Sequence, residues 1–181
     1  GGMPREGRLG VHCLGRVFEL DRQGRLYSQC HVFPWVHAPI LEYVLHSAGR
    51  EPTGEWKIFA ELGHTADWVR FYEHRCERGF LQVADRDPQL FTDLLKIFSG
   101  QPVADPGDGR FADGALVVYP LPKVPMLVSY WPDDGELGSQ LSLLFDSTAE
   151  HNLPAESLYR LTQGLVDMFR KLYHRHGAPV G

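Results

Sequence analysis

Apolar side chains recur every three or four residues in four stretches of the chain, which is the spacing of amphipathic helices. The predicted helices cover residues 39–48, 65–78, 87–99 and 154–172. Proline stands in the first turn of three of them, and glycine directly follows three, as expected for helix starts and ends. In the second helix, the side chains expected to face inward are Trp68, Phe71, Tyr72 and Cys76.

Shorter apolar runs between turn-forming residues predict strands. Residues 15–20 and 25–30 flank the sequence DRQG, which favours a β-hairpin with Gly24 in the turn. Further strands are predicted at residues 115–119, 124–131 and 140–145. The run at 124–131 is apolar on both faces, as in a central strand. Strands and helices come in separate blocks, so we expect an α+β fold: a mainly antiparallel sheet of about five strands, with helices packed on one face.

The length of 181 residues fits one domain with a substantial core. We expect a single α+β domain over residues 3–181, and we interpret the first two glycines as an expression remnant. Residues 101–110 are polar and rich in Pro and Gly, which predicts an internal linker loop between two halves of that domain. His174 and His176 lie in a polar tail, where fraying is expected.

Composition and charge narrow the class of protein. Hydrophobic residues make up 43% and charged residues 23%, as in globular chains. The net charge is −5 and no basic stripe is present, so we expect no nucleic-acid partner. No apolar run approaches the ~20 residues of a membrane span, so we expect no membrane partner. Three cysteines without framework spacing indicate reduced thiols in the cytoplasm. The oligomeric state is left open.

Two polar loops with flanking aromatic residues are the candidate ligand site. One covers residues 52–68 and the other residues 146–153, directly after a predicted strand. The candidate ligand-binding residues are Glu55, Trp56, Tyr130, Trp131, Asp146 and His151. A purely structural interpretation also fits, because Asp, Ser and Thr are common turn and cap residues and Trp56 would pin the first loop.

A second cluster contains the candidate metal ligands His12, Cys13, Cys30 and His31, to which His37 could add a further ligand. If the hairpin turn has two residues, the strands run on past Gly15 and bring these pairs diagonally together. Cys13 and Cys30 then share one face and the histidines the other, which disfavours a tetrahedral zinc site. A three-residue turn would instead mix Cys with His. The alternative is buried thiols and surface histidines.

The segment PLPKVPMLVSYW followed by LSLLFDSTAEHNLPAESLYRL, together with PTGEWKIFAEL, resembles an uncharacterised domain family of anaerobic bacteria and archaea. The resemblance covers about residues 15–172. Some members of that family carry an additional four-cysteine iron–sulfur module, similar to one in corrinoid proteins of one-carbon metabolism. This chain lacks the close cysteine spacing of that module. The resemblance implies a tetrapyrrole as a candidate cofactor class.

Three functional hypotheses follow. The first is a non-catalytic domain that binds a small molecule or cofactor between the two loops, possessing no recognisable catalytic geometry. The second is a hydrolase or lyase that uses Asp146, Glu55 and His151 for acid–base chemistry, if these side chains converge on one pocket. The third is a protein-interaction or assembly module, which predicts an exposed apolar patch around Trp35 and Trp131.

Overall fold

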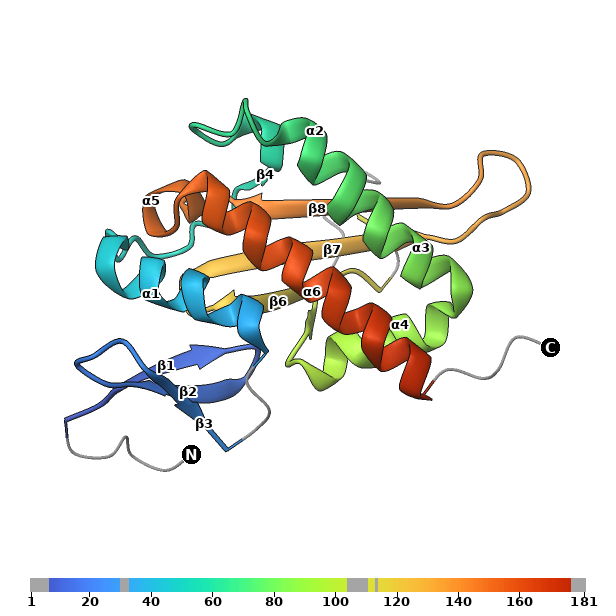
Figure 1. Ribbon diagram of the computed structural model, residues 1–181. Coiled ribbons are helices and arrows are strands. Elements are labelled where there is room, and N and C mark those ends of the chain that lie inside the picture. Colours follow the sequence, from blue (N-terminus) through green and yellow to red (C-terminus); the bar gives the residue numbers. More distant parts are fainter. Residues whose placement is uncertain (1–6, 30–32, 104–110, 113, 177–181) are drawn as a thin grey trace.

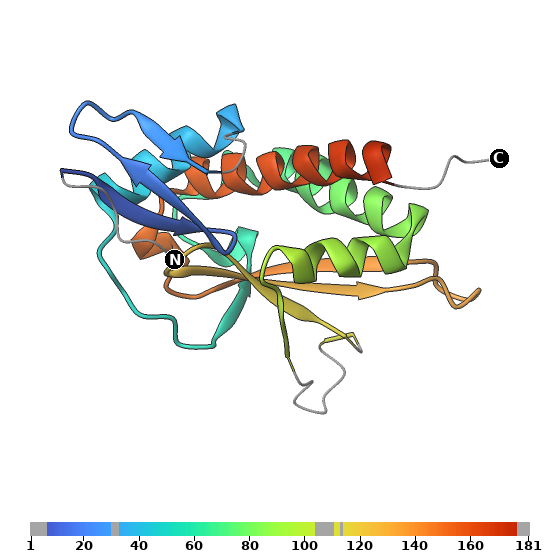
Figure 2. The same cartoon turned by 90° about the horizontal axis from the view of Figure 1, so that it is seen from below.

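The computed structural model describes residues 7–29, 33–103, 111–112 and 114–176. A five-stranded antiparallel sheet in the order β4-β8-β7-β6-β5 forms the centre of the molecule, and helices cover one of its faces (Figures 1 and 2). Its strands are β4 (Trp56–Ile58), β5 (Gln101–Pro102), β6 (Leu116–Leu121), β7 (Val124–Trp131) and β8 (Gln140–Asp146). The predicted α+β fold is therefore confirmed.

Strand β7 is central, as its apolar pattern predicts. It pairs with β6 on one side and with β8 on the other, and its first six residues are buried. Side chains alternate between the two faces of the sheet. Met126 and Val128 enter the main core under the helices, whereas Leu127 joins a smaller cluster with Phe111 on the opposite face. Both faces of the sheet are therefore partly covered.

The helical layer is built around α6 (Ala155–His176), which runs diagonally across the sheet (Figure 1). Its predicted apolar stripe faces the core, and Leu158, Leu161, Leu165 and Phe169 are at most 2% exposed. The helix α4 (Pro88–Ile97) starts as predicted, because the Asp87 carboxylate accepts a hydrogen bond of 2.9 Å from the Leu90 amide. The short 3₁₀ turn η1 (Pro34–Val36) leads into α1 (His37–His46), and α5 (Ala149–Asn152) precedes α6.

The predicted helix end at Gly79 is wrong. Helix α2 (Val69–Tyr72) continues through a π-helical turn (Glu73–Glu77) into α3 (Arg78–Arg86) without a break. Gly79 is buried against α6, where a Cβ atom would lie 2.7 Å from Cγ1 of Val166. The glycine thus permits close helix contact and does not end the helix. Phe71, expected to face inward, is 53% exposed, so this part of the predicted inward face is wrong.

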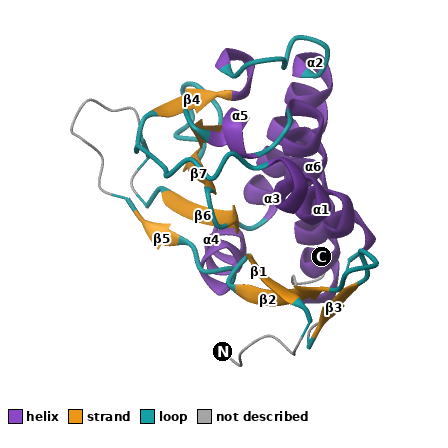
Figure 3. Ribbon diagram, turned by 90° about the vertical axis from the view of Figure 1, so that its left-hand side faces the viewer, coloured by secondary structure: helices purple, strands orange, loops and turns teal. Residues whose placement is uncertain are grey.

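A separate three-stranded sheet lies beside the large one (Figure 3). It contains β1 (Leu9–Cys13), β2 (Arg16–Leu20) and β3 (Leu26–Ser28) in that order. The predicted hairpin between residues 15–20 and 25–30 is confirmed where it is described, but five residues separate the paired Leu20 and Leu26. The chain also reverses at Leu14 and Gly15, so the strands do not run on past Gly15 as predicted.

The expected linker loop at residues 101–110 is wrong at its start. Gln101 and Pro102 form β5, an edge strand that pairs with Val117 and Leu116 of β6. Residues 104–110 lie outside the described part of the chain. The first half of the fold is therefore joined to the sheet by strand pairing, and not only by the covalent connection.

Candidate functional site

The two predicted loops meet, and Asp146 joins them. The backbone amides of Thr53 and Gly54 donate hydrogen bonds of 2.9 and 2.6 Å to Oδ2 of Asp146. The amide and hydroxyl of Thr148 donate to Oδ1 at 3.0 and 2.7 Å. β4 extends the contact, because Trp56 pairs with Asp146 and the Ser147 amide donates to the Glu55 carbonyl at 2.7 Å. The first loop is thus anchored as an edge strand of the sheet.

The same contacts remove Asp146 from ligand chemistry. Its exposed fraction is 0%. Burial alone would raise the pKa of Asp146, but the hydrogen bonds from Thr148, Gly54 and Thr53 outweigh burial and hold that pKa below its ordinary value. A carboxylate with both oxygens occupied and no access to solvent is a structural anchor, and it cannot exchange a proton with a substrate.

Two neighbouring residues, Glu150 and Asn152, complete this anchor, and neither role was predicted from the sequence. The carboxylate of Glu150 accepts a hydrogen bond from the Gly63 amide. The fully buried Asn152 accepts from the Ser47 hydroxyl at 3.1 Å and the Arg50 amide at 2.9 Å. Its amide group donates to the carbonyls of Arg50 and Lys123, both at 2.8 Å. Asn152, in α5, thereby joins the segment after α1 to the turn between β6 and β7, which no local signal in the sequence could reveal.

The remaining candidates near this anchor are divided between solvent and core. The side chains of Glu55 and His151 are exposed. Trp56 is half-buried and packs against the small apolar cluster on the sheet face away from the helices. The structure therefore brings Glu55, Trp56, Asp146 and His151 to one end of the sheet, but the central carboxylate faces the protein interior.

Tyr130 and Trp131 lie at the opposite end of the sheet. β7 and β8 run antiparallel, so Trp131 pairs with Gln140 while Asp146 follows Phe145, which pairs with Met126. The predicted aromatic wall is therefore separated from Asp146 by almost the whole strand. The Tyr130 hydroxyl instead donates a hydrogen bond of 3.1 Å to Asp85 of α3. Burial, followed by the Asp85 carboxylate, raises the pKa of Tyr130 to about 12.

The candidate metal ligands are not paired as expected. His12 pairs with Val17 and Cys13 with Arg16, so the strand that carries them adjoins β2 and not β3. Cys13 is buried. Cys30 and His31 lie outside the described residues. Within the part of the chain that the structure describes, no three His, Cys, Asp or Glu side chains gather closely enough to hold a metal ion.

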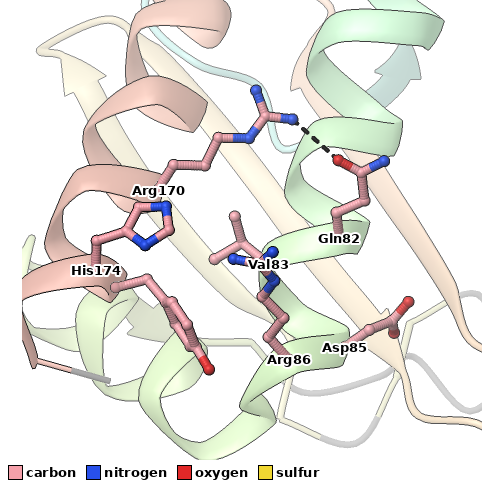
Figure 4. Close-up of a pocket in the computed structure, with 7 residues that line it drawn as sticks. Gln82, Val83, Asp85, Arg86, Arg170 and His174 are labelled. Atoms are coloured by element: carbon pink, nitrogen blue, oxygen red, sulfur yellow. Dashed lines mark hydrogen bonds between the residues drawn. The ribbon is translucent and has the colours of Figure 1, made fainter. Parts of the chain in front are cut away.

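A groove with a volume of about 520 Å³ lies between α3 and α6 (Figure 4). Its lining residues are Gln82, Val83, Asp85, Arg86, Arg170, Tyr173 and His174. We refer to it as the α3/α6 groove. The two helices run in the same direction and touch at Gly79 and Val166. The groove lies towards their carboxyl ends, beyond this point of contact.

The polar groups of the α3/α6 groove are largely basic. Arg170 donates a hydrogen bond of 3.1 Å to Gln82, and the Arg86 guanidinium lies 5.6 Å from the centre of the Tyr173 ring. Figure 4 shows Arg86 pointing into the groove from α3 and His174 facing it from α6, while Asp85 points away. His174 lies within α6, which extends to His176.

A family model described as "Domain of unknown function (DUF3786)" matches residues 2–168. The chain belongs to this family. No curated protein and no solved structure matches the chain. The predicted membership of an uncharacterised domain family is therefore confirmed. In this DUF3786 domain the matched segment contains both sheets and all of α3, and it ends within α6 shortly before Arg170. No helix among the described residues has the length and apolar character required to cross a membrane.

The sequence of the DUF3786 domain does contain a weak signal for the groove. Gln82 and Arg86 are four residues apart on α3, and Arg170 and His174 are four apart on α6, although only Arg170 lies within a helix that the sequence predicts. Residues with this spacing share a helix face. The signal is incomplete, because periodicity shows that each pair is aligned but does not show that the two helices are neighbours.

Proposed function

We propose that the protein is a non-catalytic cytoplasmic domain that binds a small molecule in the α3/α6 groove. The observation that carries the proposal is a cavity of about 520 Å³, lined by convergent polar side chains over an apolar floor. This volume lies within the range of small-ligand sites. Val83 and Tyr173 are 3% and 8% exposed and supply the apolar surface, while Gln82, Arg86, Arg170 and His174 supply hydrogen-bonding groups.

The groove supports this function better than the loops at residues 52–68 and 146–153. The loops meet, but the side chains of Asp146 and Asn152 form their hydrogen bonds with backbone groups of the protein itself. The acid–base alternative loses support for the same reason, because Asp146 is its central residue. The interaction alternative depends on an exposed patch around Trp35 and Trp131, but both side chains are half-buried. The Trp35 ring also packs directly on Gly164 of α6.

The test is a binding screen monitored by NMR on the isotopically labelled chain, using mixtures of neutral, cationic and anionic small metabolites. We expect ligands to shift the amide signals of Val83, Arg86 and Arg170. The substitution Gln82→Trp places a large ring at the wall of the groove and should abolish binding. Gln89→Trp, at an exposed position of α4 outside the groove, is the matched control and should retain it.

Two results would contradict the proposal: binding that survives Gln82→Trp, or ligand-induced shifts confined to the loops around Trp56 and His151. The ligand class suggested by the family resemblance is tested separately, by absorption spectra after incubation with haem and with cobalamin. A changed spectrum that is lost in Gln82→Trp would support a tetrapyrrole in the groove. An unchanged spectrum would exclude this class.

A further inference from the structure

We propose that the α3/α6 groove recognises an oxyanion, a phosphate or carboxylate group, through Arg86 and Arg170. This inference rests on the proposed small-molecule function and specifies the chemistry of its ligand. Whichever molecule carries the group, the shared requirement is a compact negative charge with several acceptor oxygens. A guanidinium group matches this requirement, because its planar N–H donors can bind two oxygens at once.

Arg86 and Arg170 both have N–H donors that the protein does not use. A guanidinium group has five N–H donors. Among the described residues, Arg86 forms neither a hydrogen bond nor an ion pair, and its guanidinium group lies over the Tyr173 ring. Arg170 uses Nη2 on Gln82 at 3.1 Å and holds Nη1 at 3.7 Å from Asp167. Both guanidinium groups therefore retain donors that a ligand could use.

The charged side chains that line the α3/α6 groove also favour an anion. The whole chain carries a net charge of −5, but two arginines and one histidine line the groove against a single carboxylate. That carboxylate, Asp85, accepts the hydrogen bond of Tyr130 and points away from the basic side chains (Figure 4). It does not neutralise Arg86 across the groove. Asp167 lies 3.7 Å from Nη1 of Arg170 and offsets part of its charge. Arg86 therefore supplies most of the positive charge that an anion would meet in the groove.

The close approach of α3 and α6 positions the two arginines on the same groove. Gly79 allows α3 to approach α6 closely at Val166, and an Arg170 nitrogen would lie 3.3 Å from a Cβ added at Gly79. The guanidinium group of Arg170 therefore lies close to the backbone of α3 at Gly79. Arg86 approaches from the last turn of α3, on the same side of the helix as Gln82. The helix dipole also stabilises a basic side chain at the end of a helix. The alternative explanation for Arg86 is therefore stabilisation of α3, which the experiment below separates from ligand binding.

The experiment compares two anions with an uncharged probe. Pyrophosphate, citrate and glycerol are titrated separately into the labelled full chain at low ionic strength, and amide shifts at Gln82, Arg86, Arg170 and His174 are recorded. We expect pyrophosphate or citrate to shift these signals and glycerol to leave them unchanged. The anion that binds more tightly distinguishes phosphate from carboxylate recognition. Higher salt should weaken the binding.

Charge-matched variants separate a site from general attraction. Arg86→Gln and Arg170→Gln should each weaken binding about tenfold, the effect of losing one charge-assisted hydrogen bond. Arg78→Gln removes the same charge from an exposed position of α3 outside the groove and should change the affinity less than twofold. Spectra of the unliganded variants show whether they keep the fold. Arg86→Lys is a further variant that keeps the positive charge but lacks the planar N–H donors of the guanidinium group.

Three results would overturn the inference: no shift with either anion, an equal loss of affinity in Arg78→Gln, or full affinity in Arg86→Gln. If neutral molecules from the screen shift the groove signals while both anions do not, the small-molecule function stands and oxyanion recognition fails. If no molecule of any charge shifts them, both proposals fail.

Discussion

At the scale of single residues, Asp146 shows why a polar residue in a loop is ambiguous. Asp, Ser and Thr after a strand are found both in binding sites and in turns. The sequence therefore allowed a ligand site, and the structure assigns the carboxylate to the amides of Thr53 and Gly54. These donors lie more than 90 positions earlier in the chain. A local pattern contains no information about partners this distant.

The structural role of Asp146 predicts acid-sensitive stability. Its pKa is lower in the folded chain than the ordinary value of about 3.9, so the ionised form stabilises the fold at neutral pH. This contribution is complete above the ordinary pKa and is lost as the pH falls through the folded pKa. Asp146→Asn should lower the free energy of unfolding by about 2–3 kcal/mol at pH 7 and by progressively less below pH ~4. Urea unfolding between pH 7 and pH 3 measures both effects.

The exposed Asp67 gives the control for that experiment. Asp67→Asn should leave the stability at neutral pH almost unchanged, because surface substitutions have small effects. Parallel stability–pH curves for the native chain and Asp146→Asn would show that the buried carboxylate is not responsible for the acid sensitivity.

At the scale of elements, long periodic segments were the predictable part of the fold. The stripe of α6 and the doubly apolar β7 lie where their patterns place them, because burial imposes the period directly. The small sheet was only half predicted. Its first reversal uses Leu14 at a φ of 50° beside Gly15 at 72°, and a leucine at positive φ gives no turn signal. β5 was missed because two residues are too few to show alternation.

The contact between α3 and α6 predicts an unusual response to alanine. Gly→Ala within a helix normally raises stability by up to about 1 kcal/mol. At Gly79 the added Cβ would lie 2.7 Å from Cγ1 of Val166, so the helices must separate. We expect Gly79→Ala to lower the free energy of unfolding by about 1–3 kcal/mol, the usual cost of overpacking. Thermal and urea unfolding measure this change.

A double-mutant cycle identifies the contact responsible. In the background of Val166→Ala, which removes the clashing methyl group, Gly79→Ala should cost clearly less than in the native chain. A stabilising Gly79→Ala, or an equal cost in both backgrounds, would show that the helix contact does not constrain this position.

At the scale of the whole molecule, the α3/α6 groove and the anchor around Asn152 share one property. Each depends on side chains from segments that are 80 or more residues apart in the sequence and meet only in the folded chain. The sequence therefore predicted the layers of the fold well and its site poorly. The family match to residues 2–168 names no ligand, so the candidate site rests on tertiary geometry.

The two sheets predict unequal local stability. β7 is hydrogen-bonded on both sides and Leu127 is 0% exposed, so its amides should exchange with solvent only through global unfolding. All three residues of β3 are half-buried. A hydrogen bond of 3.1 Å from the Leu14 amide to the Tyr119 carbonyl helps to join the small sheet to β6. Fewer buried contacts must therefore break to open β2 and β3.

In native-state hydrogen exchange at increasing urea, we expect the free energy of exchange for β7 amides to fall with the slope of global unfolding. Amides of β2 should show a lower free energy and a smaller slope, because a local opening exposes less surface. The Leu143 amide of β8 is the internal control and should follow β7. Equal protection of β2 and β7 would mean that the small sheet unfolds only together with the rest of the molecule.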